Sequence, residues 1–224
     1  MGKTGIQVSA LGIGGYHLGS TKNQDEANAI VRVGVALQGL RNRVVLMSKV
    51  CAHGRDKKVA MRMLEESLRR LRTDHLDVWQ IHEVVYWNDP DLIFAPDGAA
   101  EALAQAKREG KVRFVGFTGH KDPRMHLKML SHDFPFDTVQ MPLTCLDGTF
   151  RSFETQVLPA LAPRYAMSLP VATTISGIDS IEVLRQNLEI ARNFQPLTAA
   201  EQKSLRDRCR DAAADGHDVE KLRV

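Results

Sequence analysis

Short apolar runs that favour β-strands alternate with amphipathic helical stretches from residue 44 onward, and this alternation constrains the fold more than any other feature. The strand-like runs cover Val44–Val50, His75–His82, Val112–Thr118, Thr138–Met141 and Val171–Ile175. Each run is nearly continuously apolar, as expected for strands whose two faces are both covered by helices. The sequence therefore predicts an α/β fold with a parallel sheet.

The spacing of these runs predicts eight strand–helix units. Strands starting at residues 44, 76, 112 and 137 are 32, 36 and 25 residues apart, so one unit takes roughly 30 residues. Two stretches break this rhythm, because helical segments 25–33 with 35–40, and 153–161 with 165–167, follow each other with no strand between them. We predict a (β/α)8 TIM barrel, folded as one domain over residues 1–224, whose second and seventh strand regions are missing from this sequence. Either the sequence omits these internal segments, or the protein itself lacks them and could hardly close its barrel.

Charge and hydropathy exclude several classes of protein. The 30 Lys and Arg residues nearly balance the 27 Asp and Glu residues, and the net charge of +3 does not favour a nucleic-acid partner. No run approaches the ~18 apolar residues of a membrane span, and the first residues lack the apolar core of a secretory signal. We therefore expect a cytoplasmic protein that binds neither nucleic acid nor a membrane.

Side chains at the carboxyl ends of the strands are the candidates for chemistry, because reactive groups in such a barrel lie there. The predicted strands carry Lys49, His82, Thr118-Gly119-His120, Gln140 and Ser176-Gly177 at these positions. A lysine in a partly desolvated mouth lowers the pKa of a neighbouring phenol, and a histidine hydrogen-bonds a carbonyl oxygen, which together suit proton donation to a developing alkoxide. Taken singly, the lysine also fits a snorkelling surface residue and the histidine a structural donor.

A second candidate site is the segment Thr174–Ser180, which runs from a strand into a helix. The free N–H groups at the start of this helix favour a phosphate and hence a nucleotide. An ordinary capped helix, with Asp179 as the N-cap and Glu182 three residues later, explains the segment equally well. A Rossmann domain is not expected, because His17 stands where the third glycine of GxGxxG belongs.

The cysteines and histidines predict no metal site. Cys51, Cys145 and Cys209 are far apart and form no CxxC pair, which indicates free thiols. Neither Cys51-Ala52-His53 nor His82-Glu83 belongs to an HExxH, CxxC or HxH spacing.

Five segments together resemble the aldo-keto reductase family. They are Gly2–Gly15, Val45–Lys49, Leu76–His82, Glu109–Thr118 and Asp137–Gln140. The first is similar to the family's N-terminal hairpin and first strand, the second and third to the strands that carry its catalytic lysine and histidine, and the last two to its fifth and sixth strands. The variant Thr118-Gly119-His120-Lys121 resembles a bacterial-type branch of the family.

The resemblance implies a (β/α)8 barrel that binds a nicotinamide dinucleotide without a Rossmann fold and reduces aldehydes or ketones to alcohols. The family uses a tetrad of tyrosine, lysine, aspartate and histidine, of which Lys49 and His82 match the lysine and the histidine. No residue matches the aspartate or the tyrosine, which belong to the missing second-strand region. Neither Tyr16 nor Tyr86 occupies the position that the tyrosine requires.

The resemblance also implies the cofactor contacts. The matching positions are Thr118 and Gln140 for the nicotinamide end, and Ser176, Gly177, Gln186 and Asn187 for the adenosine end. Gly119 replaces an asparagine of many members, and His120 is a candidate to compensate for it. Ser180 stands near the usual arginine of the 2′-phosphate site, where Arg185 is a candidate substitute. We expect NADPH, with NADH as the alternative.

Three functions are compatible with these residues. The first is a carbonyl reductase acting on a small-molecule carbonyl substrate. The second is a catalytically inactive barrel with a nucleotide-binding or regulatory role, because the tetrad aspartate and tyrosine are absent. The third is a Schiff-base enzyme that uses Lys49, which the cofactor-like segment 174–187 disfavours. In the loop His82–Pro96, the aromatic side chains suit either an apolar wall for the substrate or packing on the adjacent helix.

Overall fold

The computed structural model of the chain describes residues 4–9, 11–15, 23, 25–26, 29, 41–51, 55–143, 151–153, 155–157, 173–193 and 197–213. Its elements are β1 (Leu11–Gly14), η3 (Arg41–Arg43), β2 (Met47–Val50), α2 (Lys57–Leu71), β3 (Leu76–Ile81), α3 (Asp89–Phe94), α4 (Ala99–Arg108), β4 (Val112–Thr118), α5 (Pro123–Ser131), β5 (Thr138–Gln140), β6 (Thr174–Gly177), α7 (Ile181–Arg192) and α8 (Ala199–Ala213).

These elements belong to two compact units. The smaller unit comprises Met1–Val45 and Met167–Pro196, and the larger unit comprises Leu46–Ala166 and Leu197–Val224. Strands β2 to β5 lie in the larger unit, whereas β1 and β6 lie in the smaller one. The prediction of one domain over the whole chain stays a prediction.

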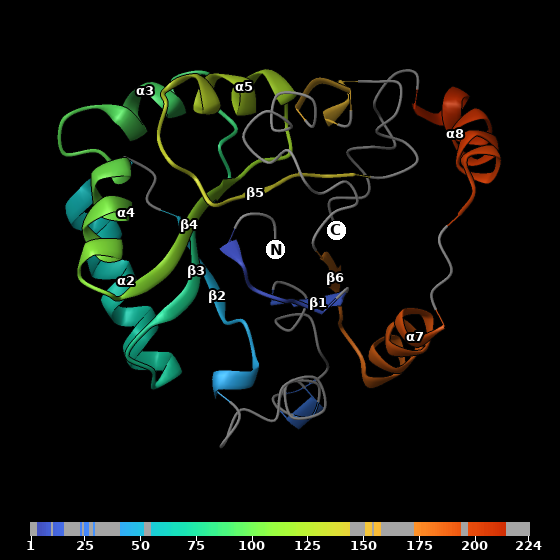
Figure 1. Cartoon of the computed structure of the whole chain (residues 1–224), viewed down its shortest axis with the longest axis horizontal. Helices are drawn as coiled ribbons and strands as arrows, with labels where there is room; N and C mark the ends of the chain where they lie inside the picture. Colours follow the sequence, from blue (N-terminus) through green and yellow to red (C-terminus); the bar gives the residue numbers. More distant parts are fainter. Residues whose placement is uncertain are drawn as a thin grey trace. The chain divides into compact units, whose positions relative to one another are not determined.

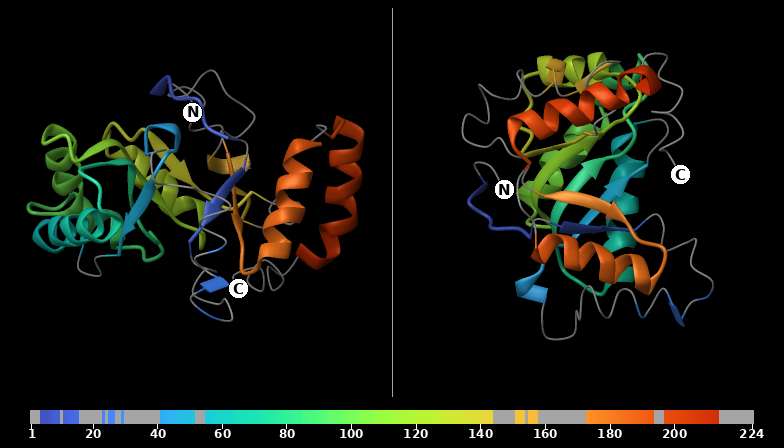
Figure 2. Two further views of the ribbon diagram at one scale, coloured as in Figure 1. Left: turned by 90° about the horizontal axis from the view of Figure 1, so that it is seen from below. Right: turned by 90° about the vertical axis from the view of Figure 1, so that its right-hand side faces the viewer.

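A four-stranded parallel sheet with the order β2-β3-β4-β5 forms the centre of the larger unit (Figure 1). Every residue of β3 is buried, as expected for a strand covered on both faces. Helices α2 and α4 pack against each other beside this sheet, and Figure 2 shows the same sheet from two further directions. Trp79 and Phe117 are the largest fully buried side chains of the core.

The boundaries of helices α2 and α4 follow from capping residues. Asp56 accepts a hydrogen bond from the backbone N–H of Val59 at 2.8 Å and so begins α2, while Arg72 ends it in a left-handed conformation (φ 52°). Gly110 follows α4 in a left-handed conformation (φ 72°), which suits a glycine. Towards the carboxyl terminus, Thr198 and Glu201 form a capping box at the start of α8.

Strand β2 is shorter than predicted. It begins at Met47 and not at Val44, because the N–H of Leu46 donates to the side chain of Asp77 (Oδ2, 2.9 Å) and not to a backbone carbonyl. The carbonyl of Leu46 accepts the N–H groups of both Asp77 and Val78. The buried Asp77 carboxylate therefore takes the place of a backbone acceptor for the Leu46 N–H.

The smaller unit contains a parallel pair of strands, β1 and β6, in register from Leu11 with Thr174 to Gly14 with Gly177. The predicted first strand is thus confirmed, whereas the described residues 4–9 contain no strand of the expected hairpin. The strand expected at Val171–Ile175 extends to Gly177, because pairing with β1 continues through Gly14. Residues 171 and 172 lie outside the described residues.

The described part of the chain contains six strands, with none between β1 and β2 or between β5 and β6. These are the two places at which the sequence predicted missing strand regions. The helical segments predicted there lie wholly or largely outside the described residues, although residues 25–26, 29, 153 and 155–157 are helical. No described helix is long and apolar enough to cross a membrane.

Candidate active site at the sheet edge

The carboxyl ends of β2 to β5 meet at one edge of the sheet and bring four predicted site residues together. Lys49 is the third residue of β2, His82 follows β3, and Thr118 and Gln140 end β4 and β5. Thr118 pairs with Gln140 in the register of β4 and β5, and the N–H of His82 donates to the carbonyl of Val50 at 2.9 Å. Parallel pairing therefore aligns residues that are up to 91 positions apart in the sequence.

Thr118 fixes the orientation of the His82 ring. Its Oγ1 lies 3.0 Å from His82 Nδ1 and accepts the backbone N–H of Glu83 at 3.0 Å. When the Thr118 hydroxyl donates its own proton to Nδ1, the imidazole carries its proton on Nε2. His82 then offers an N–H donor on the side of the ring away from Thr118.

Burial and charge change the acidity of the two candidate catalytic groups. Burial lowers the pKa of the half-buried Lys49 ammonium, which makes it a better proton donor than an exposed lysine. Burial also lowers the pKa of His82, and the positive charge of Lys49 lowers it further, although Glu83 acts in the opposite direction. His82 is therefore a neutral hydrogen-bond donor at neutral pH, within electrostatic reach of a lysine.

Two glutamine side chains at this edge fit the amide end of a nicotinamide cofactor. The side-chain oxygens of Gln80 and Gln140 are buried and have no hydrogen-bond partner among the described residues. Each oxygen is an unfilled acceptor, which a carboxamide N–H group can satisfy. The predicted role of Gln140 fits this observation, and Gln80 was not predicted.

Glycine at position 116 makes room for the Gln80 side chain. Gln80 Nε2 reaches across β4 to donate to Thr138 Oγ1 at 3.1 Å. Gly116 is the β4 residue paired with both Gln80 and Thr138, and a Cβ there would collide with the Thr138 carbonyl oxygen. A side chain at position 116 would therefore disturb both the sheet and Gln80.

Position 119 also requires glycine, because its surroundings leave no room for a Cβ atom. A Cβ there would lie 2.7 Å from the carbonyl oxygen of Val84 and 2.6 Å from the ring of His126. The packing thus excludes an asparagine at the position where many relatives of the resembled family carry one. The neighbouring His120 contacts Glu83 (Nε2 to Oε1, 3.4 Å), while its buried Nδ1 has no partner among the described residues.

A buried ion pair holds the backbone that follows β3. The Arg55 guanidinium donates to the carbonyls of His82 at 2.8 Å and Glu83 at 2.6 Å, and pairs with Asp89 at 3.0 Å. The second Asp89 oxygen accepts the backbone N–H groups of Val85 and Tyr86. Arg55 and Asp89 therefore position His82, although neither was predicted from the sequence.

The aromatic residues of the loop after His82 divide between the two predicted roles. Phe94 lies in α3 and packs against the core, with its ring stacked on His132 at 4.1 Å. Tyr86 and Trp87 are exposed and lie beneath the cations of Lys121 and Arg124. Only these two exposed rings remain available to a substrate.

The predicted adenosine-end residues lie in the smaller unit. Ser176 and Gly177 belong to β6, while Gln186 and Asn187 lie in α7 with the exposed Arg185. The predicted N-cap is wrong by one residue, because Ser180, and not Asp179, accepts the N–H of Val183 at 3.2 Å. The capped helix is thus present, with a different capping residue.

His126 gives the larger unit a testable dependence of stability on pH. Burial lowers its pKa to about 4, and its Nε2 lies 3.3 Å from the Gln140 carbonyl oxygen. An unfolded histidine titrates near 6.5, so the unfolded chain binds more protons between those two values. We expect the free energy of unfolding to fall by about 3 kcal/mol as the pH drops from 6.5 to about 4, on the scale of 1.36 kcal/mol per pKa unit.

Urea unfolding at several pH values measures this effect. The His126→Leu variant should lose most of the acid-dependent decrease, whereas a matched change at the exposed, ring-stacked histidine, His132→Leu, should keep it. An unchanged pH dependence in His126→Leu would contradict the assignment.

Comparison with known proteins agrees with this geometry. The sequence model of the Aldo/keto reductase family matches residues 16–162. Aldo-keto reductase YhdN of Bacillus subtilis is 25% identical over 212 residues, covering 78% of this chain and 59% of that protein. Methylglyoxal reductase DkgB of Salmonella typhi is 30% identical over 112 residues, covering 50% of this chain and 40% of that protein. The chain thus spans less than two thirds of the length of these curated relatives.

Solved structures show the same fold. The apo form of aldo-keto reductase AKR11C1 from Bacillus halodurans matches with a TM-score of 0.63 and 21% identity, covering 92% of this chain and 94% of that one. The predicted (β/α)8 barrel fold class is thereby confirmed. Because the family model matches more than half of its residues, the chain belongs to the Aldo/keto reductase family.

Proposed function

We propose that this protein is an oxidoreductase that reduces aldehydes or ketones to alcohols with a nicotinamide cofactor. The observation that carries the proposal is the placement of Lys49 and His82 at one sheet edge, where Thr118 orients the imidazole and burial lowers the pKa of the lysine. A carbonyl group placed at this edge meets an N–H donor and an ammonium group together. Membership of the family supports the same class of reaction.

Each of the two residues has a separate task in this proposal. His82 donates its Nε2 proton as a hydrogen bond to the carbonyl oxygen and so orients the substrate. When bound, the cofactor supplies the hydride that reduces the carbonyl carbon. The carbonyl oxygen then takes a proton from the Lys49 ammonium, and the resulting amine recovers a proton from water. Lysine has this task because no residue of the chain matches the family's tyrosine.

The proposed cofactor is NADPH, with NADH as the alternative. Gln80, Gln140 and Thr118 would hold the nicotinamide carboxamide, and His120 would replace the asparagine that the packing around Gly119 excludes. At the adenosine end, the proposal assigns Ser176, Gly177, Gln186 and Asn187 to the cofactor and Arg185 to a 2′-phosphate. The exposed cation of Arg185 supports the phosphorylated form.

The remaining predictions belong to the same proposal. The substrate is a small carbonyl compound, in keeping with the name of one relative, methylglyoxal reductase. The exposed rings of Tyr86 and Trp87 would form the apolar side of its binding site. We also propose a cytoplasmic location, a single domain over residues 1–224, and membership of the bacterial-type branch that is marked by Thr118–Lys121.

One observation favours a second candidate, a catalytically inactive barrel that binds a nucleotide or regulates a partner. No residue of the chain matches the tetrad aspartate or tyrosine. If those two groups are indispensable, the site would bind cofactor and carbonyl compounds without turnover.

Consumption of reduced cofactor distinguishes the two candidates. We expect the purified protein to oxidise NADPH when methylglyoxal or another small aldehyde is added, with one alcohol formed per cofactor consumed. Saturable quenching of protein fluorescence by NADPH, without any alcohol product, would favour the inactive barrel.

A further inference from the structure

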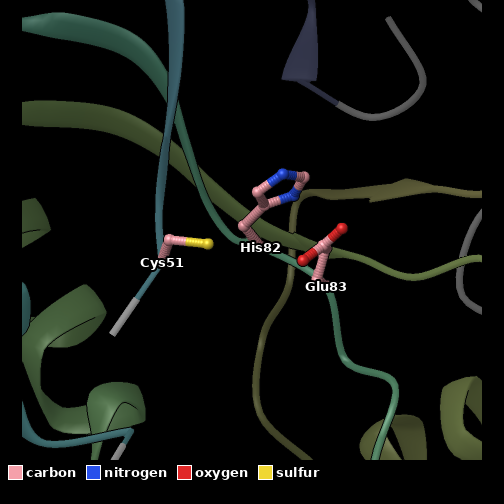
Figure 3. A group of neighbouring side chains, drawn as sticks. All are labelled: Cys51, His82 and Glu83. Carbon is pink, nitrogen blue, oxygen red and sulfur yellow. The ribbon is translucent and has the colours of Figure 1, made fainter. Parts of the chain in front are cut away.

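Three side chains that ligate metals converge beside the candidate active site. Cys51 Sγ, an imidazole nitrogen of His82 and a carboxylate oxygen of Glu83 all lie within 4.8 Å of one another, and Figure 3 shows the thiol directed toward the imidazole and carboxylate. We propose that Cys51, His82 and Glu83 bind one Zn²⁺ ion, with a fourth coordination position open to water. The spacing of these residues in the sequence had predicted no metal site.

Strand pairing brings the cysteine to the histidine. Cys51 directly follows β2 and His82 directly follows β3, and the last residues of these parallel strands, Val50 and Ile81, are paired. The hydrogen bond from the N–H of His82 to the carbonyl of Val50 continues this pairing beyond the strands. The two ligands thus come from neighbouring chain segments with a fixed register.

A left-handed backbone brings the glutamate to the same side. Consecutive side chains of an extended segment point in opposite directions, which would separate His82 from Glu83. Glu83 instead has a φ of 52°, a conformation that is costly for a residue with a Cβ. This turn allows its carboxylate to lie beside the imidazole (Figure 3).

The surrounding structure fixes that strained conformation at both ends of the residue. The N–H of Glu83 donates to Thr118 Oγ1, and its carbonyl accepts the buried Arg55 guanidinium at 2.6 Å. Strained residues that are held in this way are concentrated at functional sites. The carboxylate itself forms no part of this scaffold and contacts only the His120 ring at 3.4 Å among the hydrogen bonds of the described residues.

The donor set favours zinc over other common cations. A thiolate and an imidazole suit Zn²⁺, whereas Mg²⁺ and Ca²⁺ require oxygen ligands. Three protein ligands and one open position is the usual arrangement of a zinc site that is accessible to small molecules. The thiolate and the carboxylate together neutralise the ion, so binding adds no net positive charge beside Lys49.

The hydrogen bond between Thr118 and His82 suits coordination as well as catalysis. With Zn²⁺ on Nε2, the imidazole proton moves to Nδ1 and is donated to Thr118 Oγ1, which lies at 3.0 Å. Ligands at about 2.0 to 2.3 Å from zinc lie closer together than 4.8 Å, so small rotations of the side chains complete the site.

Occupancy of this site has a consequence that rests on the proposed function. A zinc ion on His82 Nε2 takes the nitrogen that would otherwise donate to the substrate carbonyl. Zn²⁺ should therefore inhibit carbonyl reduction reversibly, and a chelator should restore it. The binding itself does not depend on catalysis and is measured without substrate or cofactor.

Co²⁺ and Zn²⁺ serve as the probes. The reduced protein is titrated with Co²⁺, and the zinc-loaded protein is examined by X-ray absorption spectroscopy. We expect one metal ion per chain, a thiolate-to-cobalt charge-transfer band, and one sulfur at about 2.3 Å from zinc. Absence of binding, or a zinc ion without a sulfur ligand, would overturn the proposal.

Matched variants locate the site. Loss of a group that only orients a ligand costs about 10- to 100-fold in metal affinity, so Cys51→Ser and Glu83→Gln should weaken binding at least that much. The control is Cys145→Ser, a change at a cysteine outside the described residues, which should bind zinc as the unaltered protein does. Equal affinity in Cys51→Ser and the unaltered protein would also overturn the proposal. If Cys51→Ser does not fold, as judged by circular dichroism, the zinc affinity of Glu83→Gln and the zinc–sulfur distance in the unaltered protein test the proposal instead.

The inhibition experiment separates the two proposals. The zinc concentration for half-inhibition should rise at least about tenfold in Cys51→Ser, measured against the zinc-free rate of that variant. A protein that binds zinc through Cys51 and reduces no aldehyde contradicts the proposed function alone. A protein that reduces aldehydes and binds no zinc contradicts the metal site alone.

Discussion

The Lys49→Met variant should lose carbonyl reduction almost completely while it still binds NADPH. The change removes the proposed proton donor and the positive charge beside the developing alkoxide, and removal of a positioned acid costs about 10²- to 10⁴-fold in rate. Methionine retains most of the length of the lysine chain, so the half-buried site stays filled. Steady-state rates with a small aldehyde and a fluorescence titration with NADPH measure the two effects separately.

The matched control is Lys58→Met, at an exposed lysine of α2. This variant should reduce aldehydes at the rate of the unaltered protein. In the unaltered protein, kcat should fall as the pH rises through the lowered pKa of Lys49, because the deprotonated amine has no proton to donate. Turnover in Lys49→Met equal to that of Lys58→Met would refute the assignment of Lys49.

The second large effect is expected from Asp89→Leu. This change leaves the Arg55 guanidinium buried without its carboxylate, and breaking a buried pair in this way costs about 3–5 kcal/mol of stability. Two backbone N–H groups, of Val85 and Tyr86, also lose their acceptor. Urea unfolding followed by circular dichroism measures the free energy.

The matched control for this change is Asp91→Leu, two residues further along α3. The Asp91 carboxylate is exposed and pairs with Lys128, and an exposed pair contributes at most about 1 kcal/mol. A free energy of unfolding for Asp89→Leu within 1 kcal/mol of the Asp91→Leu value would contradict the structural role of the buried pair.

In the unaltered protein, protonation of Asp89 at low pH should remove the stabilisation from its ion pair with Arg55. Burial raises the pKa of Asp89, but the hydrogen bonds from Arg55, Tyr86 and Val85 and the charge of Arg55 outweigh it and leave the pKa lowered. The stabilisation is therefore present above the ordinary carboxyl pKa and is lost as the pH falls through the lowered value. This part of the acid sensitivity should be absent from Asp89→Leu.

Elements that depend on local sequence could be predicted well. The apolar stripe of Ala60, Leu64 and Leu68 underlies α2, and the nearly continuous apolar run of β3 forms a strand buried on both faces. Lys49, His82, Thr118 and Gln140 could be selected as candidates because a parallel sheet brings its carboxyl ends to one edge, and the structure places them at that edge.

Features that depend on contacts between distant segments could not be predicted. The start of β2 depends on Asp77, a carboxylate 31 residues from the Leu46 N–H that it accepts. The zinc ligands depend on the register of β2 with β3 and on the left-handed backbone of Glu83, neither of which a spacing rule detects. Gln80, a buried polar residue within a mostly apolar strand run, was a signal in the sequence that pointed to a further candidate residue.

Transfer of a labelled hydride tests the proposed reduction most directly. The purified protein is incubated with an aldehyde and with NADPH that carries deuterium at both C4 positions, and the alcohol is analysed by mass spectrometry. We predict one deuterium on the alcohol carbon that bears the oxygen, formed by the unaltered protein and by Lys58→Met but not by Lys49→Met. No labelled alcohol from unaltered protein that binds the cofactor would contradict the account and leave an inactive barrel as the function.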